Sequence, residues 1–384
     1  MINLLWSDYI LDGVRMDSTP GEMLSAACGS PAAEPEAVGG PFEPAIDETV
    51  DPAPATSSFS ATRISRYLEG ISQLKRKGIP DGLAGPHTRF MLAKALIDAI
   101  WRQGHFRLGD LCVSAQWEWD DATVGRLAAF YESVAAACDY LDSLGLRLEK
   151  YSVSRSSACR VSFKVTLDSD APVEGDDLSG DDIGLLAEIP FKTSKPRLGR
   201  GRKCPETLTG NSSDWLIYIP FDTCTFRLGG SLLAQATGQA CGQAPEILDP
   251  DYFIDSYEVV RELVEDGIVT SGVTVGDGGL LAALRRIVPE DLGLRAELGG
   301  IRASYGEDDP VRILFSEVPG VVIEVRDSDY DYLDAELLLQ DIAYYPLGHA
   351  RKSLRGILPV RDNPSDISGI LQALLESQAP EGED

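Results

Sequence analysis

Hydrophobic and polar positions follow helix and strand periods along most of this chain, from about residue 61 onward. Apolar residues at 64, 68, 71 and 74, and again between 91 and 100, have the spacing of amphipathic helices, so we expect two helices before residue 104. Further helices are predicted at 124–144, 231–237, 256–267, 279–287 and from about 330. Strands are predicted at 111–117, 146–153, 161–167, 183–189, 215–219, 268–275, 294–298, 311–315 and 320–325.

The order of these elements predicts two layered domains. Helices and strands joined by short connections are typical of α/β or α+β folds. We place the domain boundary between about residues 190 and 215, which gives an N-terminal domain at 61–205 and a C-terminal domain at 206–360. Residues 361–384 are expected to form a helix and an acidic tail.

Most of the first 60 residues lack the helix and strand periods seen in the rest of the chain. Residues 18–60 are rich in Pro, Ala, Gly, Glu and Ser and lack hydrophobic periodicity. Such a segment buries too little apolar surface to offset its ordering entropy, so we expect a disordered acidic tail over 1–60. Within it, the apolar stretch from Leu4 to Leu11 is either a short docking element or a frayed end.

Charge and composition narrow the function classes. The net charge is -27 and 43% of residues are hydrophobic, which favours a soluble chain that does not attract nucleic acid or anionic lipid. No apolar run is long enough to span a membrane. The seven cysteines are scattered without a CxxC pair, so we expect reduced thiols in a cytoplasmic protein. The acidic N-terminal stretch does not resemble a secretory signal.

Two glycine-rich helix starts are the candidate sites for binding phosphate and metal. LGGSLLAQ holds Gly229, Gly230 and Ser231, and SGVTVGDGGLLAAL holds Asp277 followed by two glycines, Gly278 and Gly279. Glycines before a helix let backbone N–H groups approach a phosphate, and the carboxylate could ligate magnesium. The alternative at each position is an ordinary turn, with Ser231 or Asp277 as the helix N-cap.

The order of four motifs resembles one family, the large form of phosphoribosylformylglycinamidine synthase, in the aminoimidazole-ribonucleotide-synthase superfamily. LGGSLLAQ, GDGGLLAAL and LFSEVPGVVIEV are similar to its LGGSALAQ, SDGGLxxxL and LFxExxGxVIQV. LCVSAQW and the helix after it are similar to its VKLSANW segment. The similarity covers roughly residues 85–350 and lies in the C-terminal half of the family's chain.

That resemblance implies a fold and a reaction. The expected fold has an N-terminal sheet domain that pairs with a partner into a barrel and a C-terminal α/β sandwich domain. The family's enzyme uses ATP, Mg²⁺ and ammonia to turn a formamide ribonucleotide into an amidine. The implied ligands are therefore ATP or ADP, Mg²⁺ and a phosphorylated small molecule or nucleotide. The implied partner is a second copy or a synthase-like subunit.

The site residues follow from the motifs, with departures. Arg155 keeps the charge of the family's lysine in VGKDSMS, and we assign it with Gly229, Gly230, Ser231, Gly278 and Gly279 to nucleotide binding. Asp277 and Glu317 are assigned to the metal. Val273 and Thr274 replace the family's His and Asp, Ser156 replaces a metal-binding Asp, and Gln116 replaces an Asn. The three histidines lie outside the motifs, and no catalytic residue is assigned.

Three functions remain open. The chain is a subunit of an amidine-forming ligase that works with separate partners, a non-catalytic relative that keeps the fold for assembly or regulation, or another ATP-using member of the superfamily with a different small substrate. No segment resembles a glutaminase, and the first synthase half is absent. The basic segment 192–203, with six Lys or Arg residues, is either a solvated loop or a flap that grips phosphate.

Overall fold

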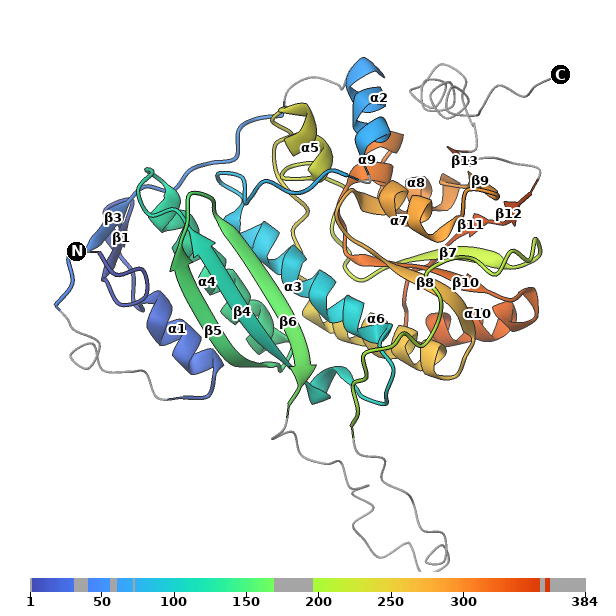
Figure 1. Cartoon of the computed structure of the whole chain (residues 1–384), viewed down its shortest axis with the longest axis horizontal. Coiled ribbons are helices and arrows are strands. Elements are labelled where there is room, and N and C mark those ends of the chain that lie inside the picture. The colour runs from blue at the N-terminus through green and yellow to red at the C-terminus, as the bar shows by residue number, and fades with distance from the viewer. Residues whose placement is uncertain are drawn as a thin grey trace, which may run out of the picture.

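The computed structural model describes residues 2–30, 41–55, 61–71, 73–168, 196–352 and 356–359 (Figure 1). The strand predicted at 183–189 and the tail at 361–384 lie outside these residues. The helices are α1 Pro20–Ala27, α2 Ala61–Gly70, α3 Ala84–Ile100, α4 Arg126–Ser143, α5 Leu232–Thr237, α6 Pro250–Glu265, α7 Gly279–Ile287, α8 Gly299–Tyr305, α9 Pro310–Phe315 and α10 Tyr330–Leu339, with 3-10 turns at Leu108–Asp110 and Asp327–Asp329.

Within the described residues the strands form four sheets. Their bounds are β1 Tyr9–Leu11, β2 Val14–Arg15, β3 Ala45–Asp47, β4 Leu111–Trp119, β5 Arg147–Arg155, β6 Arg160–Leu167, β7 Trp215–Pro220, β8 Val269–Val275, β9 Gly293–Ala296, β10 Gly320–Val325, β11 Tyr345–Gly348, β12 Ala350–Arg351 and β13 Gly356–Pro359. The sheet orders are β2-β1-β3, β5-β4-β6, β11-β7-β10-β8 and β12-β9-β13.

The N-terminal segment is folded where the composition predicts disorder. Strand β1 pairs in parallel with β3, and helix α1 begins with a capping box in which Thr19 and Glu22 exchange hydrogen bonds. Tyr9 and Leu24 are buried against the rest of the chain. The prediction of a disordered 1–60 tail is therefore wrong for the described part, because a few apolar anchors and one good cap order a segment that lacks periodicity.

The N-terminal domain is a three-stranded sheet covered by two helices. β4 pairs in parallel with β5 and antiparallel with β6. Alternate β4 side chains, including Trp117 and Trp119, are buried in the core that α3 and α4 share. The intervening Gln116 is exposed, as the period of two along a strand requires.

The C-terminal domain is built on a four-stranded antiparallel sheet. β10 lies between β7 and β8, and all six of its residues are buried. Helices α7 and α9 pack on one side with a second hydrophobic core, while α6 and α10 lie on the other side (Figure 1). The mixed α/β architecture predicted from the sequence is confirmed.

Helix α3 lies between the β5-β4-β6 sheet and the β11-β7-β10-β8 sheet. It runs between them in Figure 1 and packs against α4 and β6 on one side and α6, β8 and β10 on the other. At its end the buried Trp101 indole donates to Thr274 Oγ1 of β8 at 2.8 Å. A Cβ on Gly272 would lie 2.4 Å from this ring, so the glycine allows the indole to reach the strand.

Two predicted elements differ in the structure. Residues 311–315 form helix α9 instead of a strand, because Asp309 caps its N-terminus and Pro310 occupies the first turn. Helix α6 begins at Pro250, six residues before the predicted start, behind an Asp249 cap. In both cases the Asp-Pro pair determines where the helix begins. A short apolar run by itself does not distinguish a helix from a strand.

Candidate functional site

The two glycine-rich helix starts meet at one guanidinium, that of Arg76. Its Nε and Nη2 donate to Asp277 Oδ1 at 3.0 and 2.7 Å, Nη2 also donates to Glu317 Oε2 at 2.6 Å, and Nη1 donates to the carbonyl of Gly230 at 2.6 Å. The Arg76 side chain is 11% exposed and that of Glu317 is 6% exposed. The structure thus brings Asp277, Glu317 and Gly230 together, around a cation from a segment that is distant in sequence.

Glu317 is the anion at the centre of this cluster. Its Oε1 accepts from the backbone N–H groups of Leu232 and Gly278, both at 2.9 Å. Those N–H groups open α5 and α7. Burial raises the pKa of Glu317, and Arg76 opposes that shift. Three donors aimed at one carboxylate are the partners of an ionised acid, so Glu317 supplies a negative charge to both helix starts.

Three more N–H groups of the two turns bond within the protein. Gly229 N donates to Gln243 O, Ser231 N to Leu228 O and Gly279 N to Gly276 O. Ser231 is the N-cap of α5, since its hydroxyl accepts from Ala234 N. Four of the five residues assigned to the phosphate at these turns, namely Gly229, Ser231, Gly278 and Gly279, therefore already donate their N–H groups within the protein, and Glu317 stands in the place of an anion.

Close backbone approach explains the glycines of these turns. A Cβ on Gly229 would lie 2.2 Å from Gly242 O, and a Cβ on Gly279 would lie 2.6 Å from Ser316 O. Gly230 and Gly278 have φ values of 70° and 85°, which favour glycine. The glycines are needed for packing between chain segments as well as for any ligand.

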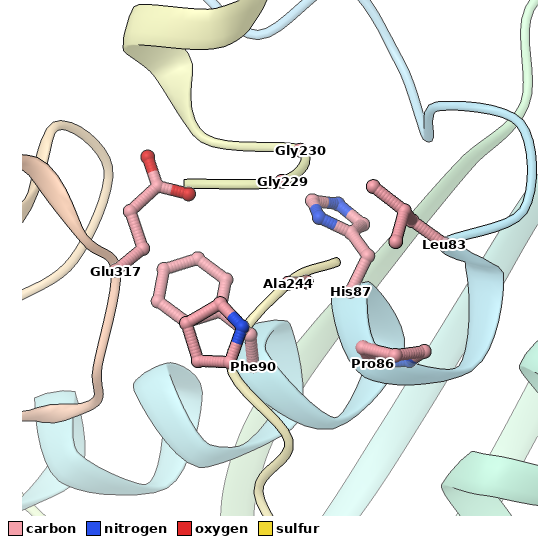
Figure 2. Close-up of a pocket in the computed structure, with 9 residues that line it drawn as sticks. Leu83, Pro86, His87, Phe90, Gly229, Gly230, Ala244 and Glu317 are labelled. Atoms are coloured by element: carbon pink, nitrogen blue, oxygen red, sulfur yellow. The ribbon is translucent and has the colours of Figure 1, made fainter. Parts of the chain in front are cut away.

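A small cavity lies under the first turn. It has a volume of about 20 Å³, room for about one water molecule. Figure 2 shows the carboxylate of Glu317 and the imidazole of His87 on opposite sides of the turn that holds Gly229 and Gly230. Burial, with the nearby Arg76 charge, holds the pKa of His87 well below its usual value, so the imidazole is neutral at pH 7.

One buried hydroxyl at the cluster lacks a partner among the described residues. Tyr67 of α2 is 2% exposed, and its Oη lies 3.1 Å from where a Cβ on Gly278 would be. Its ring packs edge-on against Phe315. Burial raises the pKa of Tyr67, with Glu317 as the next cause, so the hydroxyl keeps its proton and can donate.

A larger cavity of about 460 Å³ opens on the other side of Gly230. One wall is α5 and the turn after it, with Gln235 and Gln239, and the other includes residues 50–53 and Pro80. Gln239 Oε1 is buried without a hydrogen-bond partner among the described residues. This cavity has the volume for a small organic ligand, which the cavity under Gly229 does not.

Arg155 lies apart from the cluster. It ends β5, where its Nε pairs with Asp121 at 2.8 Å and its Nη2 donates to the carbonyl of Ile2. Neither partner belongs to the glycine turns. The charge that the resemblance assigns to a nucleotide thus holds the N-terminal segment in this structure.

The two motif positions that depart most from the family have structural contacts. Val273 and Thr274 are 1% and 3% exposed on β8, where they pair with β10. The Thr274 hydroxyl accepts from the Trp101 indole, as described above. Neither side chain can act as an acid or base, because one is apolar and the other is an engaged alcohol.

Two bases of the basic segment bond to residues of the C-terminal part of the chain. Arg202 donates to the carbonyl of Gly272 and lies over the Trp101 ring, and Lys203 pairs with Glu265 at 2.6 Å. These two bases are held by partners within the chain. Lys192 and Lys195 lie outside the described residues.

The donors present do not fit a resident magnesium ion. In the described part of the chain no three His, Cys, Asp or Glu side chains cluster as metal ligands. Asp277 and Glu317 share the Arg76 guanidinium, which fills the space between them. A cation at that point would have to displace an arginine that makes four hydrogen bonds.

The sequence did not identify Arg76, Tyr67 or His87 as site residues. Arg76 stands in the basic run KRK directly after a helical pattern, and that run is its only signal. Tyr67 falls on the buried face of a predicted helix, where an aromatic residue is expected for packing alone. Long-range contacts, such as the 241 residues between Arg76 and Glu317, do not follow from local periodicity.

Comparison with known proteins supports the resemblance. Residues 214–355 match the family of AIR synthase related protein, C-terminal domain. The chain is similar to a probable phosphoribosylformylglycinamidine synthase, chloroplastic/mitochondrial, of Arabidopsis thaliana, with 25% identity over 316 residues. The alignment covers 80% of this chain and 21% of the Arabidopsis protein. The chain is also 31% identical over 156 residues to probable membrane antigen 3 of Saimiriine herpesvirus 2, with 40% and 12% covered.

A solved structure of Thermotoga maritima PurL complexed with FGAR aligns with a TM-score of 0.48 at 13% identity, covering 78% of this chain and 42% of that one. The chain spans about a fifth of the length of the synthases it matches. The predicted similarity to part of a phosphoribosylformylglycinamidine synthase is confirmed. Within the described residues no helix has the length and apolarity to span a membrane.

Proposed function

Because residues 214–355 match the C-terminal domain of AIR synthase related proteins and most of the chain is similar to phosphoribosylformylglycinamidine synthases, we propose that it is a synthase-like protein without ligase activity of its own. It keeps the fold to associate with a partner, as an assembly or regulatory protein. The chain is also similar to a viral protein named as a membrane antigen, which is consistent with related sequences occurring in proteins that are not named as synthases.

One observation carries this proposal: four of the five N–H groups assigned to cradle a phosphate, those of Gly229, Ser231, Gly278 and Gly279, are already bonded within the protein. Leu232 and Gly278 donate to Glu317, and their neighbours donate to backbone carbonyls. A transition-state phosphate needs preorganised, available donors and a metal ion. Here the donors have internal acceptors, and Arg76 is bonded to both carboxylates assigned to the metal.

The departures at the motif positions support the same conclusion. Thr274 is bonded to Trp101, and Arg155 pairs with Asp121 away from the turns. Rebuilding a catalytic site would require at least these groups to leave buried or paired positions. Leaving the buried Trp101 indole N–H without its Thr274 partner would cost about 1–3 kcal/mol, which ligand binding would have to offset.

An activity assay tests the proposal directly. The purified full chain is incubated with ATP, Mg²⁺, formylglycinamide ribonucleotide and ammonium chloride, and ADP formation is followed. We expect no ADP above a protein-free blank. ADP release that requires both the ribonucleotide and ammonium would contradict the proposal. A T. maritima PurL preparation in the same buffer is the positive control for the assay.

A second candidate is nucleotide binding without turnover. The 460 Å³ cavity beside Gly230 favours it, since its wall carries the amide side chains of Gln235 and Gln239. Amide groups can exchange hydrogen bonds with the edge of a base. ADP at 100 times its dissociation constant would stabilise the fold by about 2.7 kcal/mol, a shift that thermal unfolding detects. Loss of the shift in Gln239→Leu would assign the cavity.

The resemblance also implies a mode of association through the N-terminal sheet. The face of β5-β4-β6 that α3 and α4 leave uncovered carries polar residues such as Gln116 and Glu118 of β4. We propose that a second copy or a synthase-like subunit meets this face. Light scattering of the full chain measures the first case: a monomer at all concentrations would exclude the homodimer.

A further inference from the structure

The guanidinium of Arg76 donates hydrogen bonds to three oxygen atoms of the kind that bind metal ions. Asp277 Oδ1, Glu317 Oε2 and the carbonyl of Gly230 all lie within 2.6 to 3.0 Å of its guanidinium nitrogens. Carboxylate and carbonyl oxygens are the ligands of hard divalent cations. The positive group among them is a side chain, and it comes from the loop after α2.

We infer that Arg76 is a built-in cation that takes the place of a divalent metal between the two helix starts. A guanidinium provides a fixed positive charge with donors in a planar fork, so one residue can satisfy two carboxylates and a carbonyl at once. The negative counterpart is Glu317, which bonds to both helix starts. The site is therefore closed by an internal ion pair and needs no metal.

The packing around Arg76 supports a fixed role. The side chain is 11% exposed, and its guanidinium lies over the Phe90 ring at 5.7 Å from the centroid. Burial alone would lower its pKa, yet Glu317 and Asp277 together raise it, so the charge is permanent. Lys77 N, the next backbone donor, binds Gln235 Oε1 and fixes the loop against α5.

This inference goes beyond the proposed function, since it concerns the cation and not turnover. A chain that binds no metal could still be shown active in the ligase assay, and an inactive chain could still bind metal. The two ideas therefore fail on different readouts: ADP formation for the first and metal binding for the second.

The test measures Mn²⁺ binding to the full chain by the loss of the free Mn²⁺ electron-spin-resonance signal. We expect the wild type and Asp277→Asn to bind the same amount of Mn²⁺, because Asp277 is engaged by Arg76. Arg76→Ala exposes the three oxygens and should bind one Mn²⁺ at least about tenfold more tightly than wild type, or about 1.4 kcal/mol. Adding Asp277→Asn to Arg76→Ala should remove the gain.

Arg227→Ala is the matched control, since it removes an arginine from a more exposed pair with Glu246. It should leave Mn²⁺ binding at the wild-type level. Wild-type binding of one Mn²⁺ that Asp277→Asn abolishes would overturn the inference, and so would a folded Arg76→Ala without any gain. If Arg76→Ala does not fold, the wild-type and Asp277→Asn comparison decides alone.

Discussion

Asp47 Oδ2 accepts a hydrogen bond from the backbone N–H of Leu127 at 2.9 Å, across 80 residues of sequence. The same carboxylate accepts from Gly125 N and Ala128 N. Helix α4 has glycine at its N-cap and therefore no cap of its own, so the N-terminal segment supplies one. The segment is thereby fastened to the central helix of the N-terminal domain.

Replacing Asp47 with Ala should lower the free energy of unfolding by about 2–3 kcal/mol. The change leaves three buried N–H groups without their charged acceptor, and hydrogen bonds to charged groups are worth about 1.5–3 kcal/mol. Urea unfolding followed by circular dichroism measures the loss. Asp8→Ala, which removes a surface pair with Arg15, is the control and should cost little. Equal stability of the two variants would refute the capping role.

Gly229→Ala should destabilise the protein strongly, while Gly299→Ala should not. Both positions have φ outside the left-handed region, so backbone strain does not separate them. A Cβ at 229 would meet Gly242 O at 2.2 Å, whereas a Cβ at 299 has nothing within 4 Å. We expect a loss of about 1–3 kcal/mol for the first and a slight gain for the second, measured by thermal unfolding. A stable Gly229→Ala would show that the turn can move.

Thr274→Val should cost about 1–3 kcal/mol despite its similar shape. The substitution removes the acceptor of the buried Trp101 indole N–H, which then has no partner. Thr274→Ser keeps the hydroxyl and should lose less. Denaturant unfolding, read by tryptophan fluorescence, compares the three proteins. If the valine variant matches wild type, the contact between α3 and β8 is carried by packing alone.

Local signals in the sequence predicted most of the helices and strands. They also predicted the two glycine-rich turns. Helix α7 and strands β6 and β7 follow from the spacing of their own apolar side chains. The N-terminal segment did not follow, because its order depends on contacts such as that of Asp47 with a helix 80 residues away. Composition reports the average burial of a segment and does not detect a few anchors.

The candidate site was predictable in part for a similar reason. Motif order placed Asp277, Glu317 and Gly230 in one family pattern, and the structure brings them together. The resemblance also assigned Arg155 to this site, yet Arg155 pairs with Asp121. The cation that does reach the carboxylates, Arg76, belongs to no motif. Spacing along the chain cannot identify a group whose role is set by a loop folding across two domains.

The buried imidazole of His87 makes the stability of the protein depend on pH. Burial and the Arg76 charge hold its folded pKa well below 6.5, whereas the unfolded chain takes up the proton near pH 6.5. The unfolded state then binds more protons than the folded state, so stability is complete above pH 6.5 and falls as the pH is lowered. From pH 6 to 5, before most carboxylates titrate, the loss due to this group should approach about 1.4 kcal/mol per pH unit. Urea unfolding at a series of pH values measures the slope. His87→Gln should flatten it, and His349→Gln, the control, should retain it. A wild-type slope that survives in His87→Gln would show that another group takes up the proton.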